Sequence, residues 1–313
     1  MIRVLGLTKK FNEITAVNEA SFEVRDGEVL GFLGPNAAGK TTTMRVITGF
    51  LAPTKGTVKV GELDVREDSL KIRKKIGYLP ESVPLYDDMK VYEYLKFIAE
   101  VRGVSASKIK ERIKEMIDVC GLSKVIRQQI GELSKGYRQR VGLGQAMIHD
   151  PEILVLDEPT SGLDPNQIVE IRSLIKRLGE KKTVILSTHI LSEVQATCSR
   201  VVIINEGKIV ASGTTEELTK QAEGKERVYV EVKGAGDSFE SVVANLSGVN
   251  KVSAKGGSAS GGNIVNNIAS WEIETDSDIR ETLFNLAVEN GWKILEMRRE
   301  QASLEDVFRN LTT

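Results

Sequence analysis

Eight consecutive residues, GPNAAGKT from Gly34 to Thr41, have the composition and spacing of a site for phosphate groups. They fit the pattern G-x-x-x-x-G-K-[ST]. In this pattern, backbone N–H groups of a glycine-bearing turn and of the next helix's first turn point into one small volume that attracts phosphate. Lys40 can then reach the β- and γ-phosphates of a nucleotide, the Thr41 hydroxyl can ligate Mg²⁺, and Thr42 can contact the α-phosphate. The pattern therefore predicts a nucleotide site.

Two elements would position this loop. Residues 29–33 are typical of a short buried strand, and the chain from Lys40 is typical of the opening of a helix. A strand before the loop and a helix after it are the context that the phosphate pattern requires. Ala37 is atypical, because closely similar loops have glycine there. If this position requires positive φ, alanine costs about 1 kcal/mol.

A second candidate group follows the apolar run 153–156, which is typical of a strand in a buried parallel sheet. Asp157 and Glu158 come directly after it. Ligands of open α/β sheets bind at the carboxyl ends of the strands, so we expect both acids beside the phosphate loop. Strand alternation would point them in different directions, so that one can hold Mg²⁺ while the other polarises a water molecule. The alternative, an acid pair that only caps a strand end, is disfavoured by Lys40.

Other candidates are a histidine, a helix start and an aromatic residue. His189 follows the apolar strand pattern TVILST, where a histidine near a nucleotide is a candidate γ-phosphate sensor. Ser134 can cap the helix after it, so a helix N-terminus with Ser134 and Gly136 is available to a phosphate. Phe11 could stack on an adenine face, although a packed aromatic fits the sequence equally well.

Composition excludes several classes of protein. With 313 residues, the chain predicts one large domain and a smaller one. Its 43 Lys and Arg residues nearly balance 44 Asp and Glu residues, which gives no argument for nucleic-acid binding. Cys120 and Cys198 form no C-x-x-C pair, which indicates a reducing compartment and no metal framework. We see no N-terminal signal pattern, and the apolar runs are too short to span a bilayer, so if the protein works at a membrane, another chain must provide the span.

The remaining pattern predicts an α/β domain over residues 1–220. Asp26-Gly27 indicates a hairpin between strands near the N-terminus, and residues 57–65 indicate another around Gly61. From about residue 83 to 150, apolar residues at helical spacing predict an inserted helical lobe. A strand at 183–188 and a hairpin at Glu206-Gly207 close the domain.

Residues 221–313 predict a second, accessory domain. After a polar linker helix at 214–224, the chain has the order strand, helix, strand, strand, helix, strand, which is typical of a small ferredoxin-like α+β domain, and a last helix at 304–311. We interpret GGSASGGN, at 256–263, as a flexible hairpin loop, because it has no lysine and no helix follows. We expect no catalytic residues here.

With these residues identified, residues 1 to about 220 resemble the nucleotide-binding domain of ABC transporters. The motifs are, in the family's order, GPNAAGKTT as Walker A, LSKGYRQR as the signature, ILVLDE as Walker B, SGLD as the D-loop and Thr188-His189 as the switch histidine. The resemblance implies a P-loop NTPase core, with an antiparallel β subdomain and an inserted helical lobe, that binds ATP and Mg²⁺.

The resemblance also implies roles for single residues. The residues expected to bind the nucleotide are Phe11 at the base and, at the phosphates, Gly34, Pro35, Asn36, Ala37, Ala38, Gly39, Lys40, Thr41 and Thr42. Asp157 would hold the metal through water, Glu158 would activate the attacking water, and His189 would contact the γ-phosphate. Ser134 and Gly136 would act on ATP held by a second protomer.

Three positions depart from the family pattern. Glu81 stands where the family usually has a glutamine near Mg²⁺ and the membrane partner, so an anion replaces an amide at an expected metal position. Lys135 and Tyr137 alter the signature, and Ala37 alters the phosphate loop.

The phrases IGYLPE, LSKGYRQR and SLEDVF are similar to a branch of ABC ATPases that partners separately encoded export permeases, including drug, antibiotic and gliding-motility systems. This implies an ATPase subunit on the cytoplasmic face of the cell membrane, working as a homodimer that sandwiches ATP. One alternative is a soluble ABC protein acting on ribosomes or DNA, but the usual second ATPase domain or coiled-coil insertion is not seen. Another is a regulatory module whose C-terminal domain senses a ligand.

Overall fold

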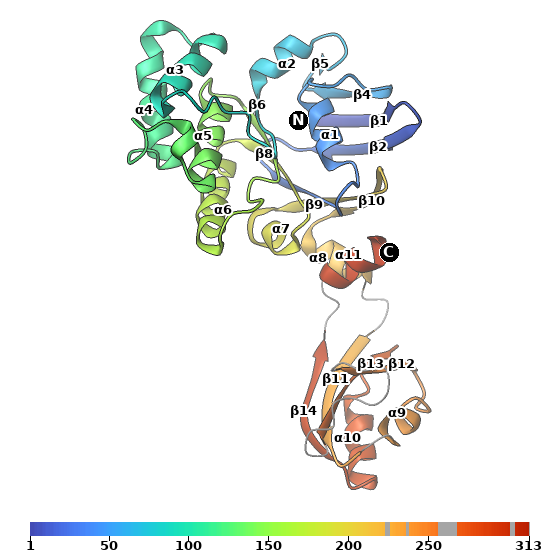
Figure 1. Ribbon diagram of the computed structural model, residues 1–313. Helices are drawn as coiled ribbons and strands as arrows, with labels where there is room; N and C mark the ends of the chain where they lie inside the picture. Colours follow the sequence, from blue (N-terminus) through green and yellow to red (C-terminus); the bar gives the residue numbers. More distant parts are fainter. Residues whose placement is uncertain (223–225, 236–237, 256–267, 301–303, 313) are drawn as a thin grey trace. The chain divides into compact units, whose positions relative to one another are not determined.

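The computed structural model describes residues 1–222, 226–235, 238–255, 268–300 and 304–312 (Figure 1). Its contacts divide the chain into two compact units. The first is Met1–Thr215 with the end of the chain from Leu311, and the second is Glu216–Asn310. The functional division near residue 220 stays a prediction. In the part of the chain that the structure describes, we find no helix with the length and apolar character to cross a bilayer.

A six-stranded sheet with the strand order β10-β9-β3-β8-β7-β6 forms the centre of the first unit. Its strands are β3 (Val29–Leu33), β6 (Ile76–Leu79), β7 (Ile153–Asp157), β8 (Thr183–Thr188), β9 (Arg200–Asn205) and β10 (Lys208–Gly213). All pairs are parallel except β9 with β10, which confirms the hairpin expected at Glu206-Gly207. The register sets Leu33 beside Thr188 and Asp157 beside Ser187. The ends of β3, β7 and β8 therefore share one edge.

Both faces of this sheet are covered, because alternate side chains of its strands enter two different cores. Leu154 and Leu156 belong to the core beside the helices, whereas Ile153 and Val155 belong to the core beside a second sheet. This explains why all five residues of β7 are buried and why its sequence is continuously apolar up to Asp157.

The second sheet of this unit is antiparallel, with the strand order β2-β1-β4-β5. Its strands are β1 (Ile2–Phe11), β2 (Ile14–Val24), β4 (Lys55–Val60) and β5 (Leu63–Asp64). The pairing of β4 with β5 confirms the hairpin around Gly61. The hairpin predicted at Asp26-Gly27 is wrong, because β2 and β3 lie in different sheets. The apolar strand β3 is buried on both faces between β8 and β9, which a two-stranded hairpin could not provide.

Helices cover the first unit, and Figure 1 shows α3, α4 and α5 gathered on one side of it. The helices are α1 (Lys40–Ile47), α2 (Ser69–Lys75), α3 (Val91–Val101), α4 (Ala106–Cys120), α5 (Lys135–Met147), α6 (Pro165–Gly179) and α7 (Leu191–Thr197), with a 3₁₀ turn η1 (Ile130–Glu132). Apolar residues of α3, α4 and α5 share one core, which accounts for the predicted helical lobe.

The second unit contains a four-stranded antiparallel sheet with the order β12-β13-β11-β14. The elements after β10 are α8 (Thr215–Ala222), β11 (Glu226–Lys233), α9 (Ser238–Val243), β12 (Val249–Lys255), β13 (Ile268–Thr275), α10 (Arg280–Glu289), β14 (Lys293–Glu300) and α11 (Leu304–Thr312), of which α8 begins and α11 ends at the boundary with the first unit. The order from β11 to β14 is the predicted β-α-β-β-α-β order. Phe239 stacks on Trp271 in its core, with ring centroids 4.1 Å apart. The predicted loop at 256–263 lies outside the described residues.

The loop between β3 and α1 has a constrained backbone. A Cβ atom at Gly34 would lie 2.4 Å from the carbonyl oxygen of Ile204, and one at Gly39 would lie 2.4 Å from that of Ala16. Only glycine fits this close approach. Ala37 has φ 63°, in the left-handed region that favours glycine.

We expect Ala37→Gly to raise the free energy of unfolding by about 1 kcal/mol, because it relieves this backbone strain. Urea denaturation followed by circular dichroism measures the change. Ala38→Gly is the matched control: Ala38 is buried and lies outside the positive-φ region, so the same substitution there should destabilise. Equal effects of the two substitutions would contradict the assignment of strain to Ala37.

His149 gives the fold a pH dependence. Burial, then the charge of Arg102, lowers its pKa to about 4. An unfolded chain protonates histidine near pH 6.5. Between these two values the unfolded state binds more protons, so this residue's contribution to stability is present above pH 6.5 and is lost as the pH falls towards 4. The free energy of unfolding of His149→Gln, measured at pH 7, 6 and 5, should fall less steeply than that of the original chain, and identical slopes would contradict this.

Candidate functional site

A pocket of about 310 Å³ opens between the β3–α1 loop and the ends of neighbouring strands. The residues that line it are Ala16, Asn36, Ala37, Gly39, Lys40, Thr41, Thr42, Glu81, Glu158, Ser161 and His189. The structure thus brings most of the predicted phosphate loop together with Glu81, Glu158 and His189.

Lys40 begins α1 and folds back over the loop that precedes it. Its Nζ donates to the carbonyl oxygens of Gly34, at 2.9 Å, and Pro35, at 3.0 Å. The same Nζ lies 3.3 Å from Oε1 of Glu158, and each of these two side chains is 7% exposed. A buried ammonium needs such oxygen partners, because it has lost its water. Lys40 and Glu158 therefore form the charged centre of the pocket.

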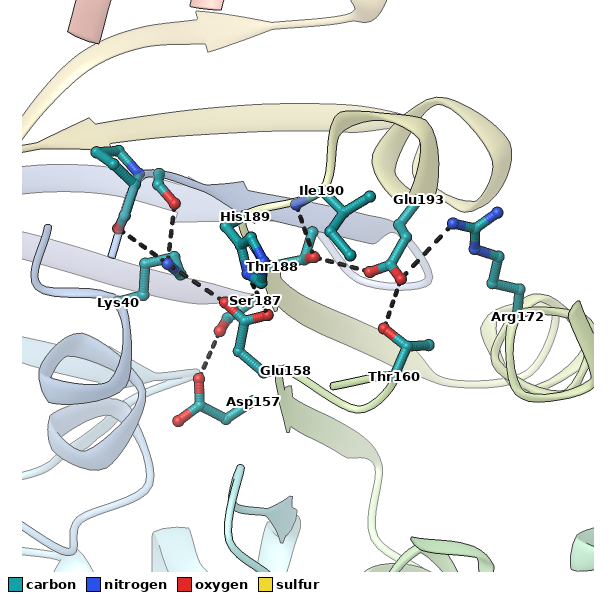
Figure 2. A network of polar contacts seen from close by, with 12 residues as sticks. Lys40, Asp157, Glu158, Thr160, Arg172, Ser187, Thr188, His189, Ile190 and Glu193 are labelled. Carbon is teal, nitrogen blue, oxygen red and sulfur yellow. Dashed lines mark hydrogen bonds and ion pairs between the residues drawn. The ribbon is translucent and has the colours of Figure 1, made fainter. Parts of the chain in front are cut away.

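Glu158 also contacts His189, as Figure 2 shows: its Oε2 lies 2.9 Å from Nδ1 of the histidine. β7 ends at Asp157, and Glu158 has φ 49°. The two acids have different partners, as expected, but strand alternation is not the cause: a left-handed backbone turn after the strand directs Glu158. Such a conformation costs free energy in a residue other than glycine, and strain of this kind is concentrated at functional sites.

Asp157 is fully buried and is not among the residues that line the pocket. Its Oδ1 accepts a hydrogen bond from Oγ of Ser187 at 2.5 Å. Its Oδ2 has no hydrogen-bond partner in the described part of the chain. Burial and the charge of Asp157 raise the pKa of Tyr78 to about 12. A carboxylate oxygen that is buried without a partner is costly, so Oδ2 is available to a cation.

These groups fit Mg²⁺. The ion prefers oxygen ligands and is held by one or two carboxylates together with substrate phosphates and water. Oδ2 of Asp157 and the hydroxyl oxygen of Thr41 are possible metal ligands of this kind, and the Glu81 carboxylate, which lines the pocket, is a third. The described residues include no cluster of three His, Cys, Asp or Glu side chains that could hold a metal alone. A Mg²⁺ bound here would take phosphate oxygens and water as further ligands, as this ion usually does in proteins.

The predicted helix start lies in a different pocket. Ser134 accepts a hydrogen bond from the backbone N–H of Tyr137 at 3.4 Å, which confirms it as the N-cap of α5. Ser134, Gly136 and Tyr137 line a separate pocket of about 400 Å³. Within one chain, the signature residues and Lys40 therefore do not converge.

Phe11 ends β1 and is 44% exposed, but it is not among the residues that line the pocket. Nζ of Lys9 lies 5.1 Å from the centre of its ring. Stacking of Phe11 on a base stays a prediction.

Sequence reasoning missed two polar residues outside the pocket that bond to Asp157 and Thr188, at the ends of β7 and β8. Ser187 could have been found, because parallel strands of known register set it beside Asp157. Glu193 lies in the first turn of the short helix α7 and is 1% exposed. Nothing in the local sequence distinguishes it from a surface acid.

Sequence comparisons with known proteins identify relatives of this chain. Residues 17–161 match the ABC transporter family. The linearmycin resistance ATP-binding protein LnrL of Bacillus subtilis is 30% identical, over 100% of this chain and 98% of its own. The bacitracin transport ATP-binding protein BcrA of Bacillus licheniformis is 32% identical, over 99% of this chain and 97% of its own.

A solved structure of an ATP-binding cassette also matches this chain. It is the dimeric post-hydrolysis state of the ATP-binding cassette MJ0796, bound to ADP and inorganic phosphate, and it is 25% identical to this chain with a TM-score of 0.63. The match covers 68% of this chain and 98% of that one. With its phosphate loop, buried acids and helical lobe in place, this chain belongs to the ATP-binding subunits of ABC transporters, a family of ATPases.

Proposed function

We propose that this subunit hydrolyses ATP to drive export through a separate membrane permease, and that two copies close around two ATP molecules. The observation that carries the proposal is the convergence of Lys40, Glu158 and His189 on the pocket of the phosphate loop. Catalysis of phosphoryl transfer depends mainly on positioning and on charge stabilisation, and this pocket has groups for both.

Each residue has a distinct role in this proposal. Lys40, the loop N–H groups and Thr42 bind the phosphates, and His189 contacts the γ-phosphate. A γ-phosphate beside Lys40 would compete with Oε1 of Glu158 for the ammonium, now 3.3 Å away. Oε1 would then be free to accept a proton from the attacking water. Asp157 and Thr41, with Glu81 at the rim, would hold Mg²⁺, which neutralises charge on the phosphates.

The separation of the two pockets supports a dimer. Ser134 and Gly136 face a pocket of their own, so the signature helix can meet a nucleotide only if that nucleotide belongs to another subunit. The related cassette described above is dimeric. ATP would bind across the closed interface and shift the population towards the closed dimer.

The relatives' names and the chain's surface support a permease. LnrL is named for linearmycin resistance and BcrA for bacitracin transport. Tyr86, 54% exposed, and Phe97, 37% exposed, contact each other with ring centroids 5.8 Å apart. Tyr86 follows the Glu81 loop, and Phe97 lies on α3. An exposed aromatic pair of this kind is suited to contact a partner protein. We propose that this partner is the permease, at the cytoplasmic face of the membrane, and that no nucleic acid is involved.

Glu158→Gln should lower kcat at least about 100-fold, because a general base contributes a factor of that order. Nucleotide binding should persist, and size-exclusion chromatography with ATP should show a stable dimer. Lys40→Ala is the contrasting variant, which should lose nucleotide binding. Full turnover by Glu158→Gln would remove Glu158 from its proposed role.

Recovery of the tagged chain from detergent-solubilised membranes should bring a membrane permease with it. The ATPase rate, measured with and without that partner, should depend on its presence. If the chain is recovered instead with a ribosome or another soluble assembly, the transport proposal is wrong, although the site could still be that of an ATPase.

A further inference from the structure

We propose that Glu193 is a positioning residue for ATP hydrolysis, which holds the segment carrying Glu158 and Ser161 against the strand end carrying His189. The inference rests on hydrolysis at the site described above. It assigns a role to a residue outside the pocket and outside the sequence motifs.

Glu193 uses both carboxylate oxygens, and Figure 2 shows its partners converging from different elements. Oε1 accepts a hydrogen bond from Oγ1 of Thr160 at 2.5 Å, and Oε2 accepts one from Oγ1 of Thr188 at 2.7 Å. Nη2 of Arg172, on α6, lies 3.6 Å from Oε1. A single buried carboxylate therefore joins the segment after β7, the end of β8 and α6.

Both threonines are next to residues that line the pocket. Thr160 lies between Glu158 and Ser161, and the N–H of Ser161 donates to the carbonyl oxygen of Glu158 at 3.1 Å. Thr188 directly precedes His189. Its hydroxyl oxygen also accepts from the N–H of Ile190 at 3.1 Å. The backbone on both sides of His189 is thus anchored to Glu193.

Stability alone does not account for a carboxylate at this position. Glu193 is 1% exposed, and well-packed apolar residues are often at least as stabilising as a buried ionic group. A carboxylate with two acceptor oxygens can instead fix two hydroxyl groups at set positions. Errors of about 1 Å in the placement of reacting groups can cost about 100-fold in rate. The geometry thus favours a role in aligning Glu158 with His189.

Glu193→Gln tests this role, because glutamine keeps the size of the side chain but its NH₂ group cannot accept a hydrogen bond from a threonine hydroxyl. We expect kcat to fall about 10-fold or more, with KM for ATP and the Kd for nucleotide within about threefold of the original. Thr188→Val should lower kcat in the same way, and the double variant should lose no more than the larger single effect.

Glu28→Gln is the matched control. Glu28 is a largely enclosed carboxylate, 10% exposed, with an arginine, Arg200, at 2.9 Å, but it precedes β3 and so lies at the opposite edge of the parallel sheet. The Glu28→Gln variant should have a lower free energy of unfolding and an unchanged kcat. If Glu28→Gln lowers kcat as much as Glu193→Gln, or if Glu193→Gln turns over at the original rate, the proposal is wrong.

A second readout does not depend on turnover. The chain has two histidines, so His149→Gln leaves His189 as the only one. In this untagged background, NMR should show that Glu193→Gln moves the ring signals of His189 and that Glu28→Gln does not. If Glu193→Gln does not fold, Thr160→Val and Thr188→Val test the two hydrogen bonds separately. Unmoved His189 signals in both would overturn the proposal, whereas inactivity of the unmodified chain would count only against the proposed function.

Discussion

The buried ion pair between Lys40 and Glu158 is the interaction on which the rest of the site depends. Two opposite charges lie 3.3 Å apart with 7% of each side chain exposed. Removal of one partner would leave the other uncompensated in a medium of low dielectric, which is strongly unfavourable. A ligand that displaces one charge must therefore supply a replacement. In the proposed function a phosphate would do this for Lys40, and His189 lies beside Glu158 at 2.9 Å. The pair thus selects for an anionic ligand.

The parallel sheet brings this pair together from distant parts of the sequence. Its register places the ends of β3, β7 and β8 at one edge, so the loop after β3 faces the acids after β7 and the histidine after β8. The buried strands allow little adjustment, because their alternate residues enter two separate cores. Because Gly34 and Gly39 have no Cβ atom, the loop can lie close to a backbone carbonyl of β9 at Gly34 and to one of β2 at Gly39. The site therefore has a largely rigid frame.

The features that the sequence predicted correctly are those that residues close together in the sequence determine. A phosphate loop needs particular residues at fixed spacing, and the helical lobe and the β-α-β-β-α-β order follow from periodicity and turns. The end of β8 also has a local signal, which is why His189 could be placed beside the loop before the fold was known. The Asp26-Gly27 hairpin was wrong because a turn sequence fixes a change of direction but does not determine which sheet receives the next strand.

Glu193 shows the opposite case, in which local sequence carries almost no information. An acidic residue in the first turn of a helix is usually explained by its favourable interaction with the positive end of the helix dipole. Here the side chain is buried, and it contacts the hydroxyl groups of Thr160, after β7, and Thr188, at the end of β8, together with an arginine from α6. None of these partners is near it in sequence except Thr188. Its role can be inferred only when the loops are placed in space, since the same carboxylate on an exposed helix would contact water. Residues outside a pocket that hold the pocket residues in position are therefore harder to find from sequence than the residues that touch the ligand.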